Sequence, residues 1–245
     1  PETALTALLA LARQGSPADQ PTVVKACAEL RWKTFSAEQN LRGLRVYELA
    51  LARGADAVAA EKKAFAPVLT APFPDPDSRV SRELSRLHCA LGDTTIIDPA
   101  LALMQADKGE GQALGSDYFQ RNPKYGQAVR AILEAAPLLE RMHHAQMLLW
   151  LAEKWTPAQR RTYFQSLADA VAFSKGGYRY ADFWRRIREA ALEHTPAGER
   201  AALADIAAPA LAETTGASCI RPHGPGRKWT VDGAAEIAFS GVRFH

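Results

Sequence analysis

Two short stretches, Ser36-Ala37-Glu38-Gln39 and Thr156-Pro157-Ala158-Gln159, decide the expected fold. Each places a hydroxyl residue, and three positions later a glutamine, at the head of an apolar-periodic segment, which is the capping-box pattern of a helix start. Thr195-Pro196-Ala197-Gly198-Glu199 repeats the hydroxyl residue. Thr156 lies 120 residues after Ser36 and 39 residues before Thr195. A period near 40 with two helices per period is typical of HEAT-like repeats, so the sequence predicts an all-α, HEAT-like α-solenoid of antiparallel helix pairs.

Apolar residues at helical spacing extend this prediction along the chain. The clearest stripe, Val80-Leu84-Leu87-Leu91, ends at Gly92, and an earlier stripe is closed by Gly54. Prolines at alternate positions make residues 71–77 irregular. No segment alternates with period 2, so no sheet is expected. We expect about eleven helices. They cover or are centred on residues 5–12, a segment starting at 21, 41–54, 58–69, 80–91, a segment from 93 or 98 to 104, 125–135, 137–154, 157–173, 178–194 and 196–211.

The domain organisation follows from a change in composition near residue 212. Residues 1–212 carry the helical pattern and are expected to form one repeat domain. Residues 213–227 are rich in Gly, Thr, Ser and Pro, as linkers are. We therefore assign residues 213–245 to a linker and C-terminal tail.

The composition of the chain limits the classes of partner and cofactor that we expect. The net charge of +3 is small for 245 residues, and no basic stripe indicates nucleic-acid binding. The longest apolar run, residues 7–12, is too short to span a bilayer, so no transmembrane segment is expected. Cys27, Cys89 and Cys219 form no C-x-x-C pair. We therefore expect neither structural zinc nor haem, and no other cofactor.

His143 and its neighbour His144 are the first candidate site residues. Together with Met142 and Met147 they offer imidazole and thioether groups, which can ligate a metal or haem iron. Adjacent helical residues point about 100° apart, however, so both cannot easily bind one ion. The alternative is that one histidine is packed and hydrogen-bonded while the other faces solvent.

The second half of the chain is rich in aromatic residues and holds the candidate partner-binding residues. Tyr178, Arg179 and Tyr180 follow Gly176-Gly177, which predicts an exposed connection. Tyrosine and arginine are enriched in binding hot spots, and we add Trp155 and His143 to this set. The alternative is that the aromatic residues form the core between helix pairs. Two basic clusters, Arg160-Arg161 and Arg185-Arg186-x-Arg188, are expected to be solvated helix faces or to meet an acidic partner.

Several stretches resemble the HEAT-like helical module of large secreted c-type cytochrome proteins of planctomycete-type bacteria. The matching pieces are Phe73-Pro74 with Ser81-Arg82-Glu83-Leu84, Arg121-Asn122-Pro123-Lys124-Tyr125-Gly126, Met142-His143-His144-Ala145, Trp155 to Phe164, Gly176-Gly177-Tyr178 with Phe183, and Gly226 to Asp232. The resemblance implies an extracytoplasmic helical module associated with redox proteins. The given sequence holds neither the β-propeller nor the C-x-x-C-H haem domain of that family, so haem binding and dehydrogenase activity do not carry over.

Two functions are compatible with these observations. The leading hypothesis is a non-enzymatic scaffold or docking subunit of an extracytoplasmic, redox-associated assembly. Its protein partner would be a c-type cytochrome or a membrane-bound redox complex. No common catalytic motif such as G-x-S-x-G, a P-loop or H-E-x-x-H occurs in the sequence. The alternative is an accessory catalytic module with a pocket between helices near His143 and Trp155.

Overall fold

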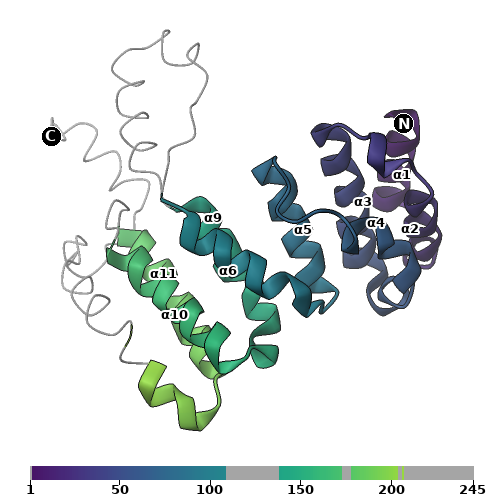
Figure 1. Cartoon of the computed structure of the whole chain (residues 1–245). Coiled ribbons are helices and arrows are strands. Elements are labelled where there is room, and N and C mark those ends of the chain that lie inside the picture. Colours follow the sequence, from purple (N-terminus) through teal and green to yellow (C-terminus); the bar gives the residue numbers. More distant parts are fainter. Residues whose placement is uncertain (1, 109–137, 173–177, 204–205, 207–245) are drawn as a thin grey trace, which may run out of the picture.

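The computed structural model describes residues 2–108, 138–172, 178–203 and 206, and this part of the chain is all α-helical, with ten α-helical segments and no strand (Figure 1). The predicted helix at 125–135 and the predicted linker and tail at 213–245 lie outside these residues. Short 3₁₀ segments, η1 to η5, join several helices. The labelled helices are α1 (Glu2–Gln14), α2 (Gln20–Ala28), α3 (Ala37–Ala59), α4 (Ala66–Leu69), α5 (Ser78–Ala90), α6 (Ile97–Ala106), α9 (Leu139–Leu148), α10 (Pro157–Ala172) and α11 (Tyr178–Glu193), and residues 197–203 are also helical.

Both predicted capping boxes are present. At the start of α3, the amide of Ser36 donates to the Gln39 side chain at 3.0 Å, and the amide of Gln39 donates to the Ser36 hydroxyl at 3.3 Å. Thr156 and Gln159 make the same pair at the start of α10, at 2.9 and 3.2 Å. Thr195, the third hydroxyl residue predicted at a helix start, makes a different contact. The Thr195 hydroxyl is buried and donates backwards to the carbonyl of Ala191 at 2.8 Å, at the end of the preceding helix.

Three of the predicted helices are continued or divided in the structure: 41–54, 58–69 and 137–154, of which the last is α9 followed by the 3₁₀ segment η5 (Leu149–Lys154). Helix α3 runs on to Ala59, but its helical geometry is interrupted directly after the expected stop at Gly54, by a kink at Ala55 where φ is 38°. A Cβ on Gly54 would lie 2.4 Å from Val58 and 2.8 Å from Gln20, so tight packing against α2 requires a glycine beside this kink. The expected helix over residues 58–69 is also divided, into the end of α3, the 3₁₀ segment η3 (Lys62–Phe65) and the short α4.

Helix α5 agrees with its prediction. Asp77 begins it by accepting the amide of Arg79 at 2.8 Å, and residues 71–77 before it are irregular. The chain leaves α5 through Gly92, whose φ of 72° favours glycine. Its predicted apolar positions Val80, Leu84 and Leu87 are at most 2% exposed. The spacing of the apolar residues therefore identified the buried face of this helix.

The buried side chains form two apolar clusters. The first surrounds Tyr47 and Phe65 and takes residues from α1 to α5. The second surrounds Tyr163, Phe164 and Trp184 and takes residues from α5 onward to residue 203. Phe73, in the irregular segment before α5, packs against both clusters.

The helices follow one another in a row, from α1 and α2 at one end to α10 and α11 at the other (Figure 1). Helix α3 packs against α1, α2 and α5, and α5 packs against α9. Helix α9 then packs against α6, and α10 packs against α6 and α11. Within the described residues, no helix is both long and apolar enough to cross a membrane.

Candidate functional site

Polar side chains from both halves of the described chain meet on helix α5. Its apolar positions point into the core, which leaves Arg82, Glu83 and Arg86 on the polar faces. The guanidinium of Arg86 donates to Glu48 of α3 at 3.0 Å and to Glu83 at 2.6 Å. Arg82 lies on the side of α5 that faces α9 and pairs with Glu140 of that helix. Helix α5 is therefore linked by ion pairs to the helices on both of its sides.

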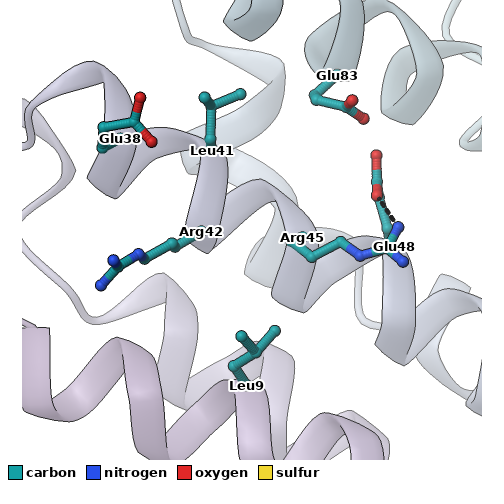
Figure 2. A pocket seen from close by; sticks show the side chains of 7 residues that line it. All are labelled: Leu9, Glu38, Leu41, Arg42, Arg45, Glu48 and Glu83. Carbon is teal, nitrogen blue, oxygen red and sulfur yellow. Dashed lines mark hydrogen bonds and ion pairs between the residues drawn. The ribbon is translucent and has the colours of Figure 1, made fainter.

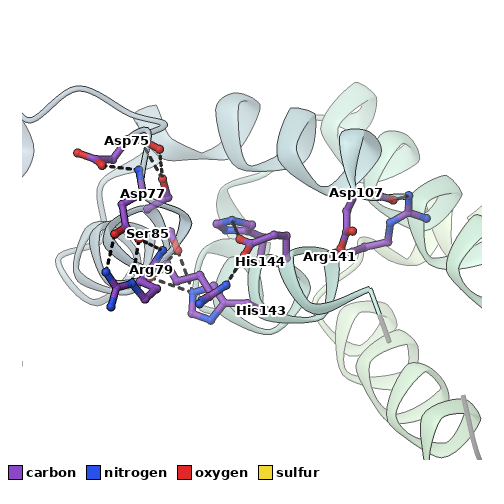
Figure 3. Close-up of polar contacts among 11 residues, drawn as sticks. Asp75, Asp77, Arg79, Ser85, Asp107, Arg141, His143 and His144 are labelled. Carbon is purple, nitrogen blue, oxygen red and sulfur yellow. Dashed lines mark hydrogen bonds and ion pairs between the residues drawn. The ribbon is translucent and has the colours of Figure 1, made fainter. Parts of the chain in front are cut away.

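His143 connects α9 to the backbone of α5. Its Nε2 atom lies 2.9 Å from the carbonyl oxygen of Arg82 and 3.1 Å from the hydroxyl oxygen of Ser85 (Figure 3). Since a carbonyl oxygen only accepts, Nε2 carries the hydrogen of the neutral ring. Burial, followed by the nearby charge of His144, lowers the pKa of His143 to about 4. The imidazole is therefore neutral near pH 7 and acts as a hydrogen-bond donor between two helices.

His144 occupies the core side of the same helix. It is fully buried, and its ring meets that of Phe73 edge-on at 6.2 Å between centroids. Its Nε2 atom lies 3.6 Å from a carboxylate oxygen of Glu140, beyond hydrogen-bonding range. The rings of His143 and His144 are nearly perpendicular, as expected for adjacent helical residues. The expectation of one packed, hydrogen-bonded histidine and one solvated histidine is met only in part: His144 is packed in the core, whereas His143 is half-buried and hydrogen-bonded to α5.

Trp155 is placed in the second apolar cluster rather than on the surface. It is 4% exposed, and its ring packs against that of Tyr163 of α10, tilted by 40° and with 4.4 Å between centroids. His143 instead faces α5, so the two residues have different neighbours. The packing therefore gives no support to a shared pocket at His143 and Trp155, and in this conformation Trp155 offers a partner almost no surface.

Tyr178, Arg179 and Tyr180 form the first turn of α11 and not a loop. Their side chains, and the Gly176-Gly177 connection before them, lie outside the described residues. Their role as partner-binding residues stays a prediction. Further along α11, Arg185 pairs with Glu189 at 3.0 Å, as expected for a solvated helix face.

Two arginines that the sequence did not single out as structural are buried and hold helix ends. Arg141 of α9 lies beside Asp107 (Figure 3) and donates to the carbonyl oxygens of Met104, Asp107 and Ser166 at 2.6, 3.0 and 3.2 Å. Arg160 is 5% exposed and donates to the carbonyl oxygen of Trp155 at 2.7 Å. The expectation that Arg160 lies on a solvated face is therefore wrong. The carbonyl oxygens of Met104, Asp107 and Trp155 lie at helix ends, where intrahelical donors are lacking, and these guanidinium groups supply them, whereas Ser166 lies within α10.

A hollow of about 380 Å³ lies over α1, α3 and α5 (Figure 2). Its lining combines two leucines with charged side chains: Leu9, Glu38, Leu41, Arg42, Arg45, Glu48 and Glu83. The residues of α3 follow one another at helical spacing, so a stripe from 38 to 48 was visible in the sequence. Its partner Glu83 comes from another helix and could not be paired with that stripe from the sequence.

Glu48 and Glu83 both line this hollow, Glu48 from α3 and Glu83 from α5 (Figure 2). Burial and the hydrogen bond with Glu48 raise the pKa of Glu83 to about 7. Burial also acts to raise the pKa of Glu48, but hydrogen bonds from Glu83 and Arg45 outweigh it and keep that pKa below its ordinary value. The two carboxyl groups therefore titrate at different pH values, Glu83 above and Glu48 below the ordinary range of a glutamate.

Comparison of the chain with protein-family models, with curated proteins and with solved structures finds no match. In the described residues, no group of three or more histidine, cysteine, aspartate or glutamate side chains is arranged to hold a metal ion.

Proposed function

We propose that this chain is a HEAT-like α-solenoid module that docks onto another protein and does not itself catalyse a reaction. The observation that carries the proposal is the row of helices, in which each helix packs mainly on its neighbours. A row of this kind presents a long surface, and extended surfaces are what helical repeat proteins use for binding.

The use of the buried polar groups also favours docking over catalysis. His143, Arg141 and Arg160 donate to main-chain carbonyl oxygens, so they hold helices together rather than face a substrate. A catalytic site needs several polar groups that converge on one pocket. The accessory catalytic module near His143 and Trp155 is the weaker hypothesis for this reason.

The partner that we propose is an extracytoplasmic redox protein, either a c-type cytochrome or a membrane-bound redox complex. This part of the proposal rests on the resemblance of the quoted motifs to the helical module of secreted cytochrome proteins. The candidate contact residues are Tyr178, Arg179 and Tyr180, at the start of α11. Their residue types are those that contribute most to binding hot spots.

The test is capture of a haem-containing partner by the full chain and by a Tyr178→Ala, Tyr180→Ala double variant. A hot-spot side chain contributes at least about 2 kcal/mol, so the double variant is expected to bind more than about thirtyfold more weakly. Leu11→Ala is the matched control, since Leu11 is 52% exposed at the other end of the row. Unfolding of each variant is measured in parallel. Equal capture by a stable double variant would remove the start of α11 from the interface, and a wild-type chain that captures no haem protein would overturn the proposed partner.

A further inference from the structure

Four basic side chains near the start of the row of helices have no protein partner. Most lysine and arginine side chains in the described residues make an ion pair or donate to a carbonyl oxygen. Arg31 and Lys33, at the 3₁₀ segment η2 (Trp32–Thr34), and Lys62 and Lys63, in η3, do neither within that part of the chain. All four are exposed, and we call them the basic surface.

The two 3₁₀ segments that carry the basic surface are neighbours in the fold. The ring of Tyr47 lies 5.7 Å from that of Trp32 in η2 and 5.1 Å from that of Phe65 in η3, between centroids. On α2, Lys25 pairs at 2.8 Å with Glu61, the residue directly before η3. Both segments therefore lie beside α2 and α3, at the end of the row where Figure 1 labels α1 to α4.

The excess positive charge of the chain is concentrated in this place. Residues 25–35 and 61–70, which include η2 and η3, hold five basic and two acidic side chains. Their net charge of +3 equals that of the whole chain, so all other residues together carry no net charge. Of the two acidic residues, Glu61 is paired with Lys25, which leaves Glu29 against the four unpaired cations. The two segments are far apart in the sequence, so this charge forms no continuous stripe there.

We propose that the basic surface binds the anionic headgroups of a phospholipid bilayer. Clustered basic side chains are attracted to anionic lipids, and each one near the bilayer strengthens binding by about fivefold. Three of the four cations are lysines, which are depleted in interfaces between proteins, so a bilayer fits this surface better than an acidic protein does. Leu69 ends α4, the helix that follows η3 directly, and is 37% exposed, so it offers an apolar side chain to the interfacial region of the lipid.

The test is cosedimentation of the full chain with vesicles of phosphatidylcholine alone or with about one-third phosphatidylglycerol. The wild type is expected to bind the mixed vesicles at least about tenfold more tightly at low ionic strength, and to lose most of this preference at about 0.5 M salt, because salt screens exposed charges. A Lys62→Gln, Lys63→Gln double variant should bind the mixed vesicles about twenty-five-fold more weakly, since it removes two of the four cations.

The matched control is a Lys108→Gln, Arg161→Gln double variant. It has the same net charge, and both of its side chains are exposed and unpaired among the described residues, one after α6 and the other on α10. It is expected to bind within about twofold of wild type. Urea unfolding should be unchanged in both double variants, because all four substituted side chains are exposed.

Equal binding to the two kinds of vesicle, or equal losses in the two double variants, would overturn the inference. A short DNA duplex at the same phosphate concentration is the second probe. Tighter binding to the duplex than to the mixed vesicles would assign the surface to nucleic acid and overturn the bilayer. The absence of binding to either kind of vesicle would overturn it as well, and would leave an acidic protein as the occupant of the surface.

Discussion

The half of the chain from α1 to α5 and the half from α6 to α11 each bury a tyrosine that donates to a main-chain carbonyl oxygen. Tyr47 donates to Ala64 and Tyr163 donates to Ala145, both at 2.7 Å. The arginines differ between the halves. Arg45 of the first half and Arg185 of the second both lie at the surface in ion pairs, but the described arginines that are buried, Arg141 and Arg160, are both in the second half and donate to carbonyl oxygens.

Helices α3 and α10 begin with similar capping boxes but are held by different polar contacts: Arg45 makes a surface ion pair, whereas Arg160 makes a buried hydrogen bond to a carbonyl oxygen. A buried guanidinium group that meets several carbonyl oxygens is costly to remove, because the oxygens then lack donors. An exposed ion pair contributes little, because water replaces it. The second half is therefore expected to depend on its polar interior more than the first half does.

The largest expected effects come from the two apolar cores. Phe65→Ala in the first core and Phe164→Ala in the second should each lower the free energy of unfolding by about 3–5 kcal/mol, because both side chains are fully buried. We expect one urea transition in each variant, since Phe73 packs on both cores. Circular dichroism and tryptophan fluorescence provide the measurement. A variant that unfolds in two separate steps would show that the halves are independent units.

Arg141→Met should be the most damaging of the polar changes. It leaves three carbonyl oxygens without their guanidinium donor, and a loss of about 2–4 kcal/mol follows. Arg45→Met is the matched change in the first half and should cost less than about 1 kcal/mol, because the side chain is half exposed. Urea unfolding of both variants measures the contrast. If both variants lose the same free energy of unfolding, then the second half does not depend on its buried arginines more than the first half depends on its surface ion pairs.

The two tyrosines test the feature that the halves share. Tyr47→Phe and Tyr163→Phe should each lower stability by about 1–3 kcal/mol, because each removes one buried hydroxyl donor and keeps the ring. The expected result is a similar loss in both variants, measured by thermal and urea unfolding. If only Tyr163→Phe is destabilising, then the carbonyl oxygen of Ala64 finds another donor, such as water, once the Tyr47 hydroxyl is removed.

The smallest effects are changes with pH, and they have opposite signs. The pKa of His143 is about 4 in the folded chain, below its ordinary value of 6.5, so its contribution to stability decreases as pH falls below about 6.5. The pKa of Glu83 is about 7, above its ordinary value of 4.5, so its contribution decreases as pH rises through 7. Each should change the free energy of unfolding by about 1–2 kcal/mol between pH 5.5 and 7.5.

The measurement compares wild type with His143→Gln and with Glu83→Gln at the two pH values. On acidification the wild type should lose stability relative to His143→Gln and gain stability relative to Glu83→Gln. A difference of the same sign for both variants would contradict the assignment of one lowered and one raised pKa.

Local sequence was enough to place most of the described helices. The capping boxes at Ser36 and Thr156, and the stop at Gly92, depend on residues within a few positions of one another. The apolar spacing of α5 likewise identified its buried face, because periodicity is a property of one helix alone. The kink at Ala55 was harder to place, since Gly54 is needed there for contact with Gln20 of another helix.

The candidate site was predicted much less well. His143, Arg160 and Glu83 are polar residues on helices, and by local criteria each would face solvent. Packing brings α9 onto α5, places Arg160 against the end of the 3₁₀ segment before α10, and brings Glu83 opposite Glu48 of α3. Sequence by itself determined where these helices begin and which side of α5 is apolar, because both depend on neighbouring residues. Tertiary structure alone decided which polar side chains are buried, because burial and a shifted pKa depend on groups that lie far away along the chain.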